Sequence, residues 1–151
     1  MAVTAIGAEG LRALAGKHLG YSEWLEITQD QVNRFADATG DHQWIHVDPE
    51  RAAAGPFGGP IAHGYLTLSL TPKLLPQILN IQGFSMGVNY GCDKVRFPSP
   101  VPVGAKLRCG ATLEEVTDVP GGVQIKVTLT YEVEGGQKPA CVAEVLLRSY
   151  T

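Results

Sequence analysis

Cysteine is scarce in this sequence, with three in 151 residues, at Cys92, Cys109 and Cys141. They are far apart, and no CxxC pair or histidine at ligand spacing accompanies them. This arrangement predicts neither a disulfide framework nor a zinc site, so we expect reduced thiols in the core. No metal is expected elsewhere.

Long apolar runs and an excess of one charge are also missing. No stretch of 18 apolar residues occurs, and the first residues lack the basic start and apolar run of a signal peptide, so no membrane span or export is expected. The net charge of −3 provides no cationic stripe for binding nucleic acid. With 44% hydrophobic and 18% charged residues, the composition is globular. We expect one domain, residues 1–151, in the cytoplasm.

Glycine-rich phosphate loops and the GxSxG motif are absent as well. The glycines of a later run lie inside a strand-like pattern and mark either the close approach of a ligand or a β-bulge, of which the bulge is the commoner. That run is therefore a weak candidate for substrate binding: Gly87, Val88, Asn89 and Tyr90.

The pattern changes near the middle of the chain. Residues up to about 80 mix helical periods with loops, whereas residues 84–150 are strand-like. From Val123 to Val133 apolar and polar residues alternate over eleven positions, which is typical of a half-buried strand. Further strands are predicted over residues 84–97, 107–116 and 140–150.

Helices are predicted in the first half. Thr28 and Gln31 fit a capping box and Gly40 a helix end, which predicts a helix over residues 28–39. A short helical turn is expected over residues 48–54.

Residues 61–79 are apolar on nearly every side, as in a buried helix, although Pro72 and Pro76 limit its regular length. A buried helix followed by long strands predicts an α+β fold in which a curved antiparallel sheet wraps a central helix. The exposed rim of such a sheet usually pairs with a second copy, so we expect a homodimer.

Two polar residues, Asp41 and His46, follow the first predicted helix. In an extended or looped segment, both side chains can converge on one water molecule. A carboxylate and an imidazole at a water are what addition or removal of water across a double bond requires. The alternative is that Asp41 caps a turn and His46 is a partly buried histidine with satisfied hydrogen bonds. On spacing alone, the alternative is the commoner case.

The second candidate is the start of the apolar helix, at His63 and Gly64. A glycine in the first turn leaves a backbone N–H open beside the positive end of the helix dipole, which suits a developing enolate or oxyanion. Close packing of helix on sheet would explain Gly64 equally well. His63 is a possible third catalytic group, although such a histidine more often shapes a loop through local hydrogen bonds.

Together these motifs resemble the MaoC-like dehydratases, the (R)-specific enoyl-CoA hydratases with a hot-dog fold. The resemblance covers roughly residues 21–150, with the motifs in about 21–80 and the sheet in about 84–150. Where that family usually carries Asn-Pro, this chain has Gln43 and Trp44, and members similar to nodulation protein N look alike here. The shared elements are Thr39-Gly40-Asp41, the histidine five positions after the aspartate, and Ile61-Ala62-His63-Gly64.

The resemblance implies reversible hydration of a trans-2-enoyl thioester, carried by coenzyme A or an acyl carrier, to an (R)-3-hydroxyacyl thioester. It implies a lyase of fatty acid metabolism that needs no cofactor, since coenzyme A enters as part of the substrate. Asp41 and His46 would be the catalytic pair. The central-helix leucines Leu66, Leu70, Leu74 and Leu75 are expected to line the acyl pocket, although packing alone explains them equally well. The oxyanion and substrate contacts would come from Gly64, His63, Ala62, Ile61 and Gln43.

Two other functions stay open. A hot-dog acyl-CoA thioesterase usually carries its carboxylate on the central helix, and residues 65–79 contain no Asp or Glu. A non-catalytic acyl-thioester-binding module is the second, because Gln43 and Trp44 depart from the family pattern.

Overall fold

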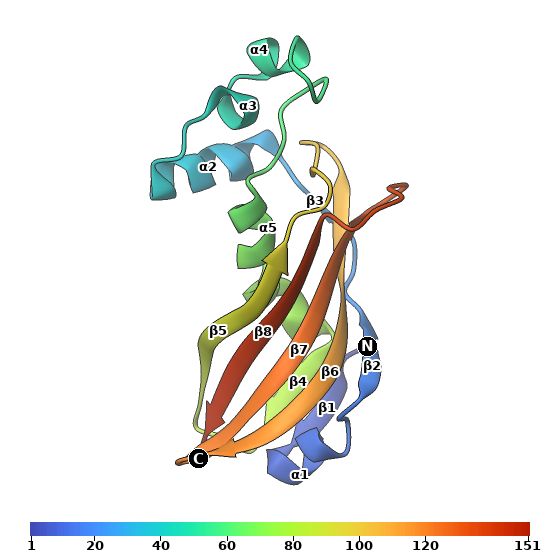
Figure 1. The fold of residues 1–151 in the computed structure, drawn as a ribbon, viewed down its shortest axis with the longest axis vertical. Helices are drawn as coiled ribbons and strands as arrows, with labels where there is room; N and C mark the ends of the chain where they lie inside the picture. Colours follow the sequence, from blue (N-terminus) through green and yellow to red (C-terminus); the bar gives the residue numbers. More distant parts are fainter.

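The computed structural model describes residues 1–151 and contains a six-stranded antiparallel sheet. Five strands follow the order β2-β6-β7-β8-β5, and β3 also pairs with β6. In Figure 1 the long strands curve over the central helical segment, which confirms the predicted α+β, hot-dog architecture. The strands are β2 Lys17–Tyr21, β3 Leu25–Glu26, β5 Met86–Arg96, β6 Lys106–Val119, β7 Gly122–Val133 and β8 Cys141–Tyr150.

A second, two-stranded parallel sheet closes the lower end of the molecule in Figure 1. It joins β1 (Val3–Ile6) to β4 (Leu79–Gln82), with α1 (Gly7–Arg12) beside it. None of these three elements was predicted, because each is too short to show a hydrophobic period. No helix of the chain is long and apolar enough to cross a membrane.

The predicted helix over residues 28–39 is confirmed as α2 (Gln29–Thr39). The Thr28 hydroxyl accepts a hydrogen bond from the Gln31 N–H at 3.1 Å, and Gly40 ends the helix with a φ of 84°. The expected short turn is α4 (Pro49–Ala53), preceded by α3 (Trp44–Val47). In Figure 1 these three helices lie together beyond one end of the sheet.

The central helical segment differs from the expectation of one helix over residues 61–79. It starts later and is broken into α5 (Gly64–Ser69), α6 (Thr71–Leu74) and a 3₁₀ turn, η1 (Leu75–Gln77). Pro72 and Pro76 each lie in the first turn of a new piece, because proline has no N–H to continue the preceding helix.

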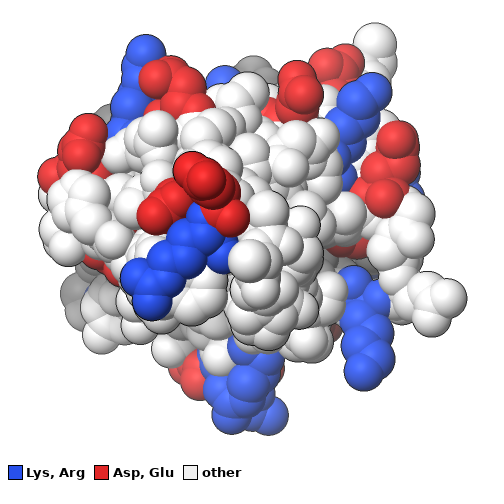
Figure 2. Space-filling model, turned by 90° about the horizontal axis from the view of Figure 1, so that it is seen from above, with Lys and Arg blue, Asp and Glu red and all other residues white.

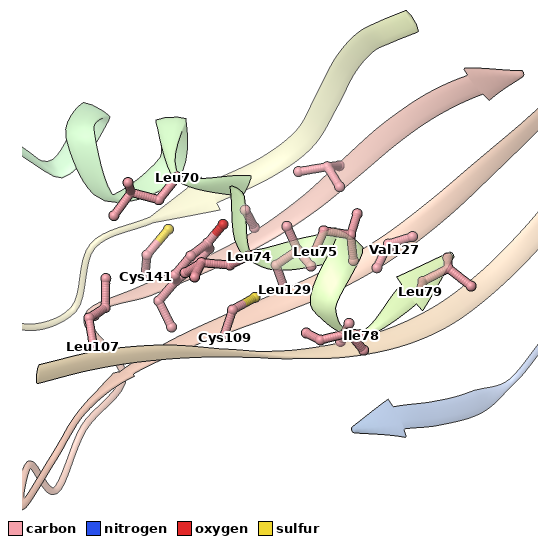
Figure 3. Close-up of a cluster of buried hydrophobic side chains, with 14 of the residues drawn as sticks. Leu70, Leu74, Leu75, Ile78, Leu79, Leu107, Cys109, Val127, Leu129 and Cys141 are labelled. Atoms are coloured by element: carbon pink, nitrogen blue, oxygen red, sulfur yellow. The ribbon is translucent and has the colours of Figure 1, made fainter. Parts of the chain in front are cut away.

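The core lies between this segment and the sheet. The alternation predicted along β7 is confirmed: Val123 to Tyr131 are at most 3% exposed at every second position. Figure 3 shows Leu70, Leu74, Leu75, Ile78 and Leu79 facing strand residues that include Val127 and Leu129.

The three cysteines are free thiols, as expected, but only two of them lie in the core. Cys109 and Cys141 are buried, and burial raises the pKa of each thiol to about 12, so both stay protonated. Cys92, expected in the core, is instead exposed on β5. The reason is that β5 is an edge strand in which no position is buried.

Candidate active site

Asp41 and His46 lie where α2, α3 and the start of α5 meet. The segment between them was expected to be extended or looped, but His46 belongs to the single turn α3. The two side chains nevertheless converge, and one carboxylate oxygen of Asp41 lies within 4.8 Å of a ring nitrogen of His46. A water molecule that donates and accepts hydrogen bonds of ordinary length bridges such a gap.

Asp41 sits just after the left-handed Gly40, and its side chain is 51% exposed. One carboxylate oxygen, Oδ1, accepts a hydrogen bond from the backbone N–H of Gln43 at 3.3 Å. The residue thus makes the local turn contact that the structural alternative assigned to it. The second oxygen, Oδ2, has no hydrogen-bond partner within the protein, so a water or substrate has access to it.

His46 is held firmly and is only 7% exposed. Its Nδ1 lies 2.7 Å from the carbonyl oxygen of Ile61. Because a carbonyl only accepts, Nδ1 carries the hydrogen, and in the neutral ring Nε2 is left with a free lone pair. The Gln29 side chain also donates to the His46 carbonyl at 2.8 Å. The ring therefore has the tautomer that a proton acceptor at Nε2 requires.

His63 precedes α5 and is 3% exposed. Its Nε2 donates to the carbonyl oxygen of Asp41 at 3.0 Å, and its ring stacks on that of His46 with centroids 3.9 Å apart. Burial lowers the pKa of His63, which favours the neutral form of the ring. The spacing of Asp41, His46 and His63 would also admit a metal ion bound by one carboxylate and two imidazoles.

A cavity of about 330 Å³ opens beside this cluster. Gly64 lines it as the first residue of α5, so its N–H has no partner within the helix. A Cβ at Gly64 would lie 3.0 Å from the Phe97 ring, so a larger residue there would require that ring to shift. The other lining residues are His46, Phe57, Ile61, Ala62, Thr67, Phe97, Pro98, Ser99, Pro100, Val101 and Ala140.

Several residues expected at the cavity lie elsewhere. Asp41 and His63 are outside its lining, and His63 contacts Asp41 where a substrate contact was expected. Gln43 is exposed and does not line the cavity either. Its backbone N–H donates a hydrogen bond to the Asp41 carboxylate. Phe57 and Phe97 were missed, although both aromatics sit among glycine and proline in loops, where a large apolar side chain has no core to join.

The weak candidate run on β5 borders a second cavity of about 790 Å³, which Gly87, Val88 and Asn89 line. The strand register shifts between Asn89 and Gly91, as it does at a β-bulge. Tyr90 does not line that cavity. Its ring packs instead against the Arg148 guanidinium, whose central carbon lies 3.5 Å from the ring centroid.

The leucines expected to line an acyl pocket behave differently from one another. Leu75 lines the second cavity, whereas Leu66, Leu70 and Leu74 line neither cavity and are buried in the core. Those three leucines are therefore explained by packing.

Comparison with known proteins places the chain among enzymes of thioester metabolism. It is 58% identical over 139 residues to 3-hydroxyacyl-thioester dehydratase Z of Mycobacterium tuberculosis, covering 91% of this chain and 92% of that protein. It is 42% identical over 146 residues to nodulation protein N of Rhizobium meliloti, covering 91% and 88%. The structure of the (R)-hydratase from A. caviae involved in PHA biosynthesis matches with a TM-score of 0.72 and 25% identity, covering 88% and 94%. Residues 11–137 match the MaoC-like domain, and the chain therefore belongs to the MaoC-like dehydratase family.

Proposed function

We propose that this protein is a hydro-lyase that reversibly adds water to a trans-2-enoyl thioester and forms the (R)-3-hydroxyacyl thioester. The observation that carries the proposal is the convergence of the Asp41 carboxylate and the His46 imidazole within 4.8 Å, with His46 and Gly64 lining one cavity. The dehydratase and (R)-hydratase relatives support the reaction class and the configuration of the product.

The free lone pair of His46 suggests the direction of proton transfer. A water held between Asp41 and His46 gives a proton to Nε2 while its oxygen bonds to C3 of the substrate. The C2–C3 π electrons move toward the thioester carbonyl and form an enolate. The imidazolium then returns the proton to C2, and the nearby Asp41 carboxylate stabilises the imidazolium while it lasts.

The enolate oxygen needs a donor, and Gly64 supports that role. Its N–H is free of helical hydrogen bonds and borders the same cavity as His46. Donors fixed before the reaction stabilise charge that develops in the transition state, at about 3 kcal/mol each.

The proposed substrate is a thioester of coenzyme A or of an acyl carrier. The proposed location of the protein is the cytoplasm. Water addition to a conjugated thioester requires a proton acceptor, a proton donor and an oxyanion donor, which the chain itself supplies, so the proposal calls for no cofactor. Figure 2, which views the end where α2, α3 and α4 lie, shows basic and acidic side chains interspersed on a largely uncharged surface. This end of the molecule therefore carries no single strongly charged patch.

Incubation of the pure protein with crotonyl-CoA tests the proposal. We expect the absorbance of the conjugated thioester to fall without release of free thiol, and chiral chromatography to identify the (R)-3-hydroxy product. EDTA should leave the rate unchanged. Thiol release that keeps pace with the absorbance loss would identify a thioesterase. Binding without turnover for enoyl chains of every length would identify a binding module.

The edge strand β5 supports a homodimer. It pairs only with β8, and its hydrophobic side chains Met86, Val88 and Tyr90 are 39–55% exposed. An exposed apolar edge pairs readily with a second copy. We therefore propose that two chains associate through β5.

Sedimentation velocity tests this association. We expect a mass near twice the 16.1 kDa of one chain, and at least a tenfold weaker dimer for Val88→Lys, which corresponds to about 1.4 kcal/mol. Ile6→Lys is the matched control, because Ile6 is also an exposed hydrophobic residue but lies on β1. Equal weakening by both variants, or by neither, would place the interface elsewhere.

A further inference from the structure

His63 is a buried polar side chain for which the proposed reaction has no direct use. It lies outside the cavity lining, and its Nδ1 is the only buried side-chain nitrogen or oxygen without a hydrogen-bond partner. An unpaired buried polar atom destabilises the fold by about 1–3 kcal/mol, so the presence of a histidine at this position calls for another explanation. We propose that His63 is a positioning residue, which fixes Asp41, His46 and Gly64 relative to one another; this inference rests on the proposed function.

The first contact ties down the loop that carries Asp41. His63 Nε2 donates to the Asp41 carbonyl at 3.0 Å and lies 4.0 Å from its carboxylate oxygen Oδ2. The other hydrogen bond of Asp41, from the Gln43 N–H, is internal to the same loop and moves with it. His63 therefore provides the long-range anchor that places this loop against the start of α5.

The second contact sets the plane of the His46 ring. The bond from His46 Nδ1 to the Ile61 carbonyl fixes one point of the ring and leaves rotation about that point. The His63 ring stacks on it at 3.9 Å with an interplanar angle of 25°, and Phe35 packs against His63 at 4.8 Å. The stacked rings of Phe35, His63 and His46 prevent that rotation and fix the direction of the His46 Nε2 lone pair.

The third link is covalent, since His63 directly precedes Gly64. The His63 carbonyl accepts hydrogen bonds from the N–H groups of Leu66 and Thr67 at 3.0 and 3.2 Å, which builds the first turn of α5. The residue that anchors Asp41 and packs on His46 thus also orients the proposed oxyanion donor. Its neutral ring keeps the donor hydrogen on Nε2 and leaves His46 free to take a proton without a neighbouring positive charge.

Two substitutions separate the hydrogen bond from the stacking. His63→Phe keeps a flat ring and loses the donor to Asp41, and we expect kcat for crotonyl-CoA to fall about 10²-fold with KM nearly unchanged, as for small misplacements of catalytic groups. His63→Gln presents an amide N–H near the position of Nε2 and should recover at least tenfold of that loss. His18→Phe, at an exposed histidine on β2, should leave the rate unchanged.

A double-mutant cycle distinguishes positioning of Asp41 from a purely structural role of His63. If His63 acts through Asp41, His63→Phe should slow the Asp41→Asn variant by less than threefold. A further 10²-fold loss in the double variant would overturn the proposal, as would full activity of a folded His63→Phe protein. If His63→Phe fails to fold, His63→Asn serves in its place, because its amide is too short to reach the Asp41 carbonyl.

A spectroscopic measurement is independent of activity. In protein labelled with ¹⁵N-histidine, we expect His63 as the Nε2–H tautomer and His46 as the Nδ1–H tautomer. We expect the His46 signals to be shifted or broadened in His63→Gln, which removes the stacked ring. Unchanged His46 signals in His63→Gln would overturn the positioning of His46 by the stacked ring. Absence of hydration by the wild-type protein, with these signals as expected, would overturn the proposed function and with it the catalytic purpose of His63, while the geometric part would stand.

Discussion

Replacing Asp41 by Asn is expected to lower kcat for hydration of crotonyl-CoA about 10³-fold, within the usual range for loss of an acid–base group. The amide retains the shape of the carboxylate and an oxygen that accepts from the Gln43 N–H. It loses the negative charge that holds the water and stabilises the His46 imidazolium. Because the side chain is half exposed, the melting temperature should stay within about 2 °C of the wild-type value.

Asp37→Asn is the matched control for this result. Asp37 lies in the last turn of α2, four residues before Asp41. Its side chain is more exposed and pairs with the His42 ring at 2.9 Å, outside the cavity. Its variant should keep the wild-type rate. Near-normal activity of Asp41→Asn, or a large drop in its melting temperature, would show that Asp41 serves the fold alone.

Replacing His46 is expected to have the largest effect, a loss of about 10⁴-fold, the upper end for a group that both takes and returns a proton. Two variants are needed, because His46 is buried and bonded to the Ile61 carbonyl. His46→Asn offers an N–H near the position of Nδ1 and keeps that bond, whereas His46→Gln places its amide near Nε2. Neither amide accepts a proton from water at neutral pH, so turnover should be lost in both.

Stopped-flow absorbance for activity and thermal melts for stability measure this prediction. His42→Gln, at a half-exposed histidine outside the cavity, should behave like the wild type. Activity retained by either folded His46 variant would rule out His46 as the proton acceptor. A collapse of the melting temperature in His46→Asn would instead identify a structural histidine.

Local patterns predicted the parts of this fold that depend on local forces. The alternation along β7 shows which face of a long strand is buried, and Thr28 with Gly40 marks both ends of α2, because caps satisfy backbone groups within a few residues. Pro72 and Pro76 predict a limit on the regular length of the central helix. The actual boundaries of its pieces depend on packing against the sheet.

The candidate site shows which contacts local sequence patterns do not predict. Asp41 and His46 are five residues apart and form a visible motif, whereas the bond from His63 to the Asp41 carbonyl joins residues 22 positions apart. No local sequence pattern indicates this hydrogen bond, because its acceptor is a backbone carbonyl, which every residue possesses. The aromatic side chains of Phe57 and Phe97 meet at the cavity for the same long-range reason.

The segment that carries Asp41 and His46 contributes little to the hydrophobic core, and this has an evolutionary consequence. Of residues 28–60, only Val32 belongs to the main cluster of buried hydrophobic side chains. Of this segment, His46 and Phe57 line the cavity. A substitution at Phe57 therefore changes the cavity wall without removing a side chain from the main core cluster, and acyl preference can change there at little expense to the stability of the sheet. Among orthologues, the residue at position 57 should accordingly vary with substrate choice, while Asp41, His46 and the buried face of the β-sheet change slowly.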